Sequence, residues 1–139
     1  MKDLPSHYIE RGFFWSHELE LLLRNFEGKT LPYLRSISGT VENLCFDVSI
    51  WINLGKKDCA AFENTEAVIQ EEVVPVAEEN PESDGILWML TKSGKLYGYH
   101  DFAVYRMGDP DDDWRTALNK LIQGEDPVFI GNAMDYIDD

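Results

Sequence analysis

The stretch that decides the fold of this 139-residue chain reads ILWMLTKSGKLYGYH and spans residues 86–100. Its first part, up to Thr91, is strongly apolar, and its last part, from Lys95, is rich in aromatic side chains. Between them lies the short connection 92–94, which ends in a glycine and is typical of the turn between two antiparallel strands. The stretch therefore predicts a β-hairpin.

Further strands are expected on both sides of this hairpin. Residues 102–107 predict a third strand, and residues 73–77 predict another in which Pro75 requires an edge position or a bulge. Upstream, apolar residues alternate with others over 41–52, which is the period of a strand with one buried face. Residues 60–62 are expected to form a short strand.

Two helices are expected, one before and one after the strands. Ser16 is the N-cap of the first, which ends near Gly28, and its apolar residues recur at helical spacing: Leu19, Leu22, Leu23 and Phe26. An Asp of the acidic stretch 109–113 caps the second, which ends at Gly124. The apolar face of this second helix consists of Trp114, Ala117, Leu118, Leu121 and Ile122.

The remaining segments give weaker patterns. Residues 1–14 predict a strand or loop, and 32–38 fit either a short helix or a turn. Residues 65–72 predict a short acidic helix, residues 78–85 a polar loop, and part of the tail 125–139 is expected to dock on the core. Together these elements indicate an α+β fold: a single domain over residues 1–139, with a mainly antiparallel central sheet and helices on one side or at its ends.

Cysteine content and hydropathy indicate a cytoplasmic protein. Cys45 and Cys59 are too few for a disulfide framework, and we interpret them as buried thiols in a reducing compartment. No apolar run is long enough to span a bilayer, and residues 1–10 lack the apolar core of a secretory signal. Of the four tryptophans, Trp88 and Trp114 are expected in the core, and Trp15 and Trp51 are candidate surface residues.

Charge is distributed unevenly along the chain. Residues 1–57 carry seven basic and seven acidic residues, whereas residues 58–139 carry five basic and nineteen acidic ones, so the net charge of −14 belongs to the second part. Such a surplus argues against direct binding to nucleic acid, because phosphate contacts need Lys and Arg. It favours encounter with a basic partner, provided that the carboxylates gather on one exposed area.

No motif indicates catalysis, a cofactor or a metal. His7, His17 and His100 are scattered and lie in no nucleophile motif, although a pair of Cys59 with His100 stays open. The acidic stretch 109–113 lacks the order of an EF-hand loop, and the glycines form no phosphate-binding loop. We therefore predict no catalytic residue, no cofactor and no metal site.

The predicted contact residues for a basic partner come from the acidic part of the chain, with two aromatic anchors. The acidic candidates are Glu78, Glu79, Asp84, Asp109, Asp111, Asp112 and Asp113. The candidate anchors are Trp51 and Tyr99, because a few aromatic side chains inside a polar rim supply most of the affinity in many interfaces.

The segment 87–124 resembles the C-terminal half of the SUKH superfamily. Its Ser93-Gly94-Lys95-Leu96-Tyr97-Gly98 is similar to that family's G-[KR]-[LV]-Y-G turn, and residues 114–124 to its W-x-x-A-L-x-x-L-[IL]-x-G helix. Residues 44–47 resemble its "FD" strand and residues 74–76 its P-[IV] strand, so the likeness covers mainly 44–124.

This resemblance implies a single SUKH-like α+β domain that acts as an immunity protein and neutralises a cognate toxin, often a basic nuclease. The leading hypothesis is thus a non-enzymatic inhibitor that binds a toxin domain by occlusion and charge complementarity, without membrane or direct nucleic-acid contact. Two alternatives stay open: a regulatory or scaffold module that binds a cellular protein, and a small hydrolase or metal-dependent enzyme. The sequence leaves the oligomeric state undetermined.

Overall fold

The computed structural model describes residues 4–83 and 85–136. Its strands form one antiparallel sheet in which each strand pairs with the next one in the sequence. The strands are β1 (Thr30–Arg35), β2 (Thr40–Cys45), β3 (Val73–Glu79), β4 (Leu87–Thr91), β5 (Leu96–His100), β6 (Ala103–Arg106) and β7 (Val128–Asn132). The helices are α1 (Leu4–Glu10), α2 (His17–Phe26), α3 (Ser49–Leu54), α4 (Ala60–Ile69) and α5 (Trp114–Ile122), with short 3-10 turns η1 (Pro81–Ser83) and η2 (Ala133–Asp135). This architecture confirms the predicted α+β class.

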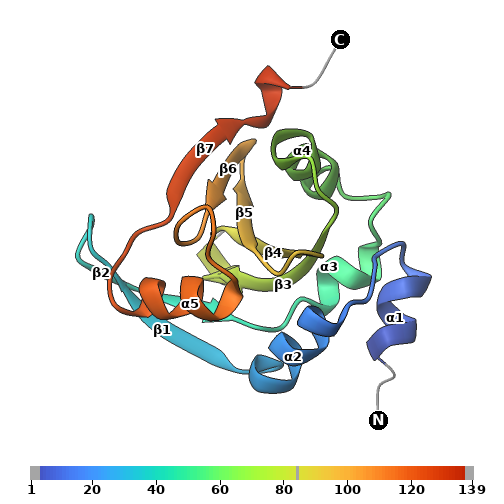
Figure 1. The fold of residues 1–139 in the computed structure, drawn as a ribbon, viewed down its shortest axis with the longest axis horizontal. Coiled ribbons are helices and arrows are strands. Elements are labelled where there is room, and N and C mark those ends of the chain that lie inside the picture. The colour runs from blue at the N-terminus through green and yellow to red at the C-terminus, as the bar shows by residue number, and fades with distance from the viewer. Residues whose placement is uncertain (1–3, 84, 137–139) are drawn as a thin grey trace.

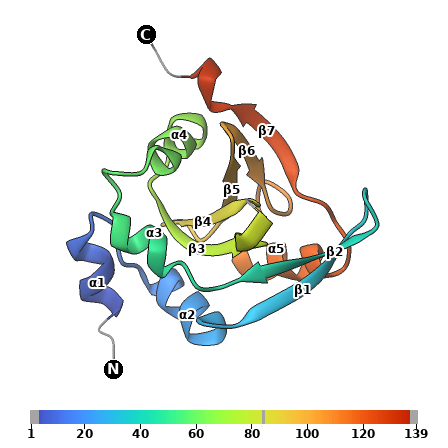
Figure 2. The ribbon, with the colours of Figure 1, turned by 180° about the vertical axis from the view of Figure 1, so that it is seen from behind.

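The sheet is strongly curved, and helices lie on different sides of it (Figure 1). Helix α4 packs against β3, β5 and η2, whereas α5 packs against β1. Both views show the chain that enters β7 passing beside the β1–β2 hairpin, although these strands lie at opposite ends of the strand order (Figure 2). All five residues of β4 are buried, so both faces of the sheet are covered at its centre.

The predicted hairpin is confirmed as β4 and β5, and it forms the middle of the core. Trp88 is fully buried and lies directly opposite Gly98. A Cβ atom at Gly98 would lie 3.0 Å from the Trp88 ring, so the missing side chain makes room for the indole. Of the two positions expected for Pro75, an edge strand or a bulge, the structure has the bulge, because β3 is an inner strand and the β3–β4 register shifts between Pro75 and Ala77.

Both predicted helix caps are confirmed. The Ser16 hydroxyl accepts a hydrogen bond from the Leu19 amide (3.1 Å), and the Asp113 carboxylate accepts one from the Thr116 amide (3.0 Å). Each bond satisfies one of the amides that the first helical turn leaves without a partner. The tail docks as expected, through β7 and η2.

The N-terminal segments differ from their predictions. Residues 1–14, expected as a strand or loop, contain α1, in which Leu4 and Tyr8 share one helical face and Tyr8 is buried. The Tyr8 hydroxyl donates to the Pro75 carbonyl (3.2 Å). Residues 32–35 belong to β1 and only residues 36–38 form a turn. Pro32 is tolerated because β1 is an edge strand.

The prediction of one strand over residues 41–52 is wrong beyond Cys45. The chain leaves the sheet there and forms α3, in which Ile52 is buried and Ile50 is 73% exposed; the N-cap residue Val48 is buried as well. An alternating apolar pattern also contains i, i+4 pairs, and in this segment the helical pair is the one that reaches the core.

The structure also differs from the short strand expected at 60–62, the helix expected at 65–72 and the loop expected at 78–85. Residues 60–62 are the first turn of α4 rather than a strand, and this helix ends at Ile69 because Gln70 takes a left-handed conformation. The loop expected at 78–85 begins later, since β3 continues to Glu79. Cys45 and Cys59 are half-buried free thiols rather than fully buried ones.

A substitution at Gly85 tests the close crossing that positions the end of β3. A Cβ atom there would overlap the carbonyl oxygen of Glu79, which is backbone and cannot rotate away. Gly85→Ala should therefore lower the free energy of unfolding by about 2–4 kcal/mol, measured by denaturant titration.

The matched control is Gly39→Ala, whose added methyl group meets no atom within 4 Å but whose φ of +70° disfavours a side chain. It should lose only about 1 kcal/mol. Equal losses in the two variants would contradict the steric argument for Gly85.

Candidate functional site

The predicted acidic contact residues do not form one surface. Glu71 and Glu72 precede β3, whereas Glu78 and Glu79 end it, and a strand of this length spans about 20 Å. The stretch 109–113 lies at the same end as Glu71, because the Trp114 amide donates to the Gly94 carbonyl in the β4–β5 turn (2.8 Å). The carboxylates are thus divided between opposite ends of the central strands.

At the turn end, most acidic residues have internal partners. Lys120 donates to Asp109 (2.8 Å) and Asp112 (2.6 Å), and its ammonium group holds the pKa of Asp112 below the ordinary value. Asp113 caps α5, whereas Asp111 is exposed and has no hydrogen bond or ion pair within the described residues. These contacts stabilise the start of α5, and Lys120 offsets much of the negative charge of the stretch 109–113.

The two candidate aromatic anchors are half-buried. The Trp51 indole donates to the Glu78 carboxylate (3.2 Å), so the structure brings one predicted anchor and one predicted acid together. The Tyr99 hydroxyl accepts from the Asn64 amide (2.9 Å). Trp15 is likewise half-buried, and Asp84 lies outside the described residues.

At the opposite end of β3, the curved sheet encloses a pocket of about 360 Å³. The pocket is lined by residues from β1, the β1–β2 turn, β3, the segment before β4, β5, β6 and the segment before β7: Arg35, Ile37, Glu79, Gly85, Ile86, His100, Tyr105, Asp126 and Pro127. Among these nine residues Arg35 is the one Lys or Arg, whereas Glu79 and Asp126 carry carboxylates. We call this site the Arg35–Glu79 pocket.

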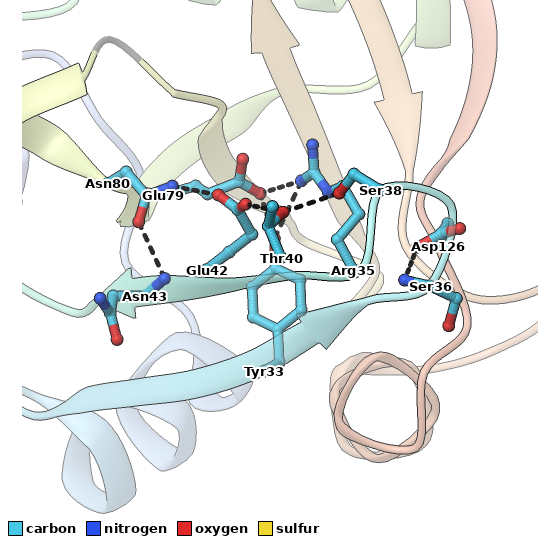
Figure 3. A network of polar contacts seen from close by, with 10 residues as sticks. All are labelled: Tyr33, Arg35, Ser36, Ser38, Thr40, Glu42, Asn43, Glu79, Asn80 and Asp126. Atoms are coloured by element: carbon cyan, nitrogen blue, oxygen red, sulfur yellow. Dashed lines mark hydrogen bonds and ion pairs between the residues drawn. The ribbon is translucent and has the colours of Figure 1, made fainter.

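Glu79 is the centre of the polar network around the pocket (Figure 3). It is only 3% exposed, so the expectation that it is a surface contact residue is wrong. The Tyr33 hydroxyl and Arg35 both donate to its Oε2 atom, the latter at 2.5 Å, and Arg35 also donates to the Tyr33 hydroxyl (3.0 Å). Burial raises the pKa of Glu79 above its ordinary value, and these two partners oppose that rise without cancelling it.

A second carboxylate fixes β2 to the segment after β3. The Asn80 side-chain amide donates to Glu42, and its carbonyl accepts from the Asn43 backbone amide (2.9 Å). Thr40 also donates to Glu42 (2.7 Å), and this bond holds the pKa of Glu42 below the ordinary value. Glu42 is half-buried and lies across from Tyr33 in the β1–β2 register, on the same face of the sheet.

Asp126 fastens the β1–β2 hairpin to the segment before β7. Its two carboxylate oxygens accept one hydrogen bond each, from the backbone amides of Ser36 and Ile37, both at 3.0 Å. The Ser36 hydroxyl also donates to the Gly124 carbonyl. A tight turn is thereby held by a residue about 90 positions further along the chain.

Among the described residues, no group of three or more His, Cys, Asp or Glu side chains could hold a metal ion. The described helices include none that is long and apolar enough to cross a membrane. Comparison with models of protein families, with curated proteins and with solved structures gave no match.

Sequence reasoning named Glu79 but missed its partners Tyr33 and Arg35 and the role of Asp126. Tyr33 and Arg35 alternate with Leu34 in a strand-like pattern, which could have indicated β1 and a shared face for the two polar side chains. Nothing in the local sequence around Asp126 indicates that it binds a distant hairpin.

The raised pKa of Glu79 predicts a specific pH dependence of stability. The folded chain holds this proton more tightly than the unfolded chain, so the contribution of Glu79 to stability should rise as the pH falls through the raised pKa toward the ordinary value of about 4.3. Glu79→Gln does not titrate, so the free energy of unfolding of the wild type should increase relative to this variant over that range.

The measurement is denaturant unfolding of both proteins at a series of pH values. Tyr33→Phe provides a second test, because loss of the Tyr33 hydrogen bond should raise the pKa of Glu79 further and move the window to higher pH. A wild-type advantage that grows with rising pH would contradict the assignment.

The Asp126 contacts predict local protection of the hairpin turn. In Asp126→Ala, exchange of the Ser36 and Ile37 amide hydrogens should become roughly tenfold faster or more, because both amides lose their acceptor. The exposed neighbour Glu125→Ala is the matched control and should leave these amides unchanged. Hydrogen exchange measured by NMR tests this, and equal exchange in wild type and Asp126→Ala would contradict it.

Proposed function

We propose that this chain is a non-enzymatic, immunity-type inhibitor that binds a basic protein, foremost a nuclease toxin, and covers its active site. The resemblance of residues 44–124 to SUKH proteins supports this proposal. The single structural observation that carries it is the unbalanced negative charge of carboxylates outside the lining of the Arg35–Glu79 pocket but at the same end of the central strands.

That imbalance follows from the register of the sheet. Glu78 lies opposite Leu87, and Leu87 lies opposite Tyr99, so the ends of β3 and β5 meet at one edge of the sheet. Glu82 and Asp101, both exposed, follow these two ends. We call Glu42, Glu78, Glu82 and Asp101 the acidic edge.

Little positive charge is available to neutralise the acidic edge. Arg35 is paired with the buried Glu79, so its charge is already matched. At the opposite end of β3, by contrast, Lys120 pairs with Asp109 and Asp112, and Lys92 lies 3.6 Å from Glu72. The acidic edge therefore supports the proposal better than the stretch 109–113 does.

The proposed mechanism is substitution of carboxylates for phosphates. A nuclease holds its substrate through Lys and Arg side chains, and the acidic edge would form charge-assisted hydrogen bonds with those side chains while the fold blocks the cleft. The net charge of −14 would accelerate encounter at low ionic strength. An inhibitor with two free thiols would meet such a toxin in the cytoplasm.

The experiment uses the C-terminal domain encoded by the gene directly upstream of this one as the probe. Purified chain should bind that domain and abolish its nuclease activity at saturation. Retained activity at saturating chain, or an upstream gene that encodes no toxin, would overturn the proposal.

Charge-neutralising variants test the role of the acidic edge. The triple variant Glu78→Gln, Glu82→Gln and Asp101→Asn should lower the association rate constant about tenfold at low salt and flatten its salt dependence. Asn suits position 101, whose φ is +47°. Stopped-flow or surface-plasmon kinetics over a range of salt concentrations gives the measurement.

The matched control makes the same change in net charge at the opposite end of the strands. It combines Glu71→Gln, Glu72→Gln and Asp111→Asn, and should lower the rate much less. Equal reductions would mean that only total charge matters, and the acidic edge would lose its assignment as the docking surface.

A further inference from the structure

The tip of the β1–β2 hairpin carries large aliphatic side chains in water. Leu34 is 50% exposed, Ile37 85% and Val41 65%. Leu34 and Val41 lie directly opposite each other in the register, so their side chains are cross-strand neighbours. Single exposed apolar residues are ordinary, but three on one hairpin indicate an interaction site.

These side chains occupy both sides of the hairpin. Leu34 and Val41 point away from the face that carries Tyr33, because successive residues of a strand alternate between faces. Ile37, in contrast, lines the Arg35–Glu79 pocket on the other side. Figures 1 and 2 show the hairpin projecting from the edge of the molecule. A projection that is apolar on both sides matches a cleft better than a flat surface.

The hairpin is held in one conformation by its polar contacts. Asp126 binds the Ser36 and Ile37 amides, and a chain of side-chain hydrogen bonds joins Ser38 to Thr40 (2.7 Å) and Thr40 to Glu42 (2.7 Å), as Figure 3 shows. An element that is already rigid loses less conformational entropy on binding. The aliphatic tip is therefore preorganised for insertion.

Charge identifies the kind of partner that this tip fits. The Glu42 carboxylate lies on the face of the hairpin opposite Leu34 and Val41, the Asp126 carboxylate lies at its turn, and the nearby Arg35 is paired with Glu79. Anionic lipid and a second copy of a chain with net charge −14 would both be repelled. A protein cleft with apolar walls and a basic rim is attracted.

The geometry points to the β1–β2 hairpin as the element that enters the partner's cleft, with Leu34, Ile37 and Val41 as anchors and the acidic edge on the basic rim. This inference rests on the proposed function and adds which element docks and what the cleft must contain. The anchors supply affinity through apolar burial, and the carboxylates supply orientation.

The test is the triple variant Leu34→Thr, Ile37→Ser and Val41→Thr, in which the strand residues keep a high β propensity. Its dissociation constant for the upstream-encoded toxin domain should increase about 100-fold, mainly through faster dissociation. The matched control is Ile9→Gln, which removes a 59% exposed aliphatic side chain on α1, far from the hairpin (Figure 1). It should bind as the wild type does.

Hydrogen exchange of the complex separates the two proposals. Protection of the amides of residues 34–41 in the complex supports the inference. If the wild type binds the toxin domain but the triple variant binds equally well and these amides stay unprotected, the inference is overturned and the proposed function stands. If the wild type forms no complex, the proposed function fails and the inference with it. Self-association that the triple variant abolishes would assign the tip to a second copy and likewise overturn the inference.

Discussion

Glu79 is a carboxylate buried at the end of a strand inside the sheet, and a buried charge is stable only when partners surround it. Its partners, Tyr33 and Arg35, come from β1, with β2 lying between the two strands. The side chains of β1 thus reach past β2 to bond with β3. Removing one partner of such a buried pair typically lowers the free energy of unfolding by roughly 3–5 kcal/mol. It fixes the β1–β2 hairpin over the end of β3, where the hairpin meets Asp126 and closes one side of the pocket.

The features that the sequence predicted are those with a local physical cause. The β4–β5 hairpin, the Ser16 cap and the Pro75 bulge each depend on residues within a few positions of one another. The errors arose where local patterns were ambiguous, as in α3, whose residues satisfy both a period of two and an i, i+4 spacing. The network around Glu79 could not have been predicted, because Glu79 lies 44 positions from Arg35 and 46 from Tyr33, and the fold of the sheet alone brings them together.

The position of charge in the sequence proved a poor guide to its position in space. The antiparallel meander places chain segments alternately at the two ends of the strands, so consecutive acidic runs are separated by the length of β3. Asp109 and Asp112, the most conspicuous acids in the sequence, are paired with Lys120 and act within α5. The less conspicuous Glu78, Glu82 and Asp101 lie where Arg35, already matched by Glu79, provides little compensation.

The acidic edge and the aliphatic hairpin tip act over different distances, and this difference gives each a separate role in recognition. Electrostatic attraction extends about 8 Å at physiological ionic strength, so the carboxylates influence a partner before contact and mainly affect how fast it arrives. Apolar burial acts only at contact and mainly affects how long the partner stays. The contacts of Glu79 and Asp126 connect the acidic edge to the aliphatic tip, because they hold Ile37 and Glu42 on one rigid hairpin. A partner attracted by the carboxylates would therefore meet the aliphatic tip already in place.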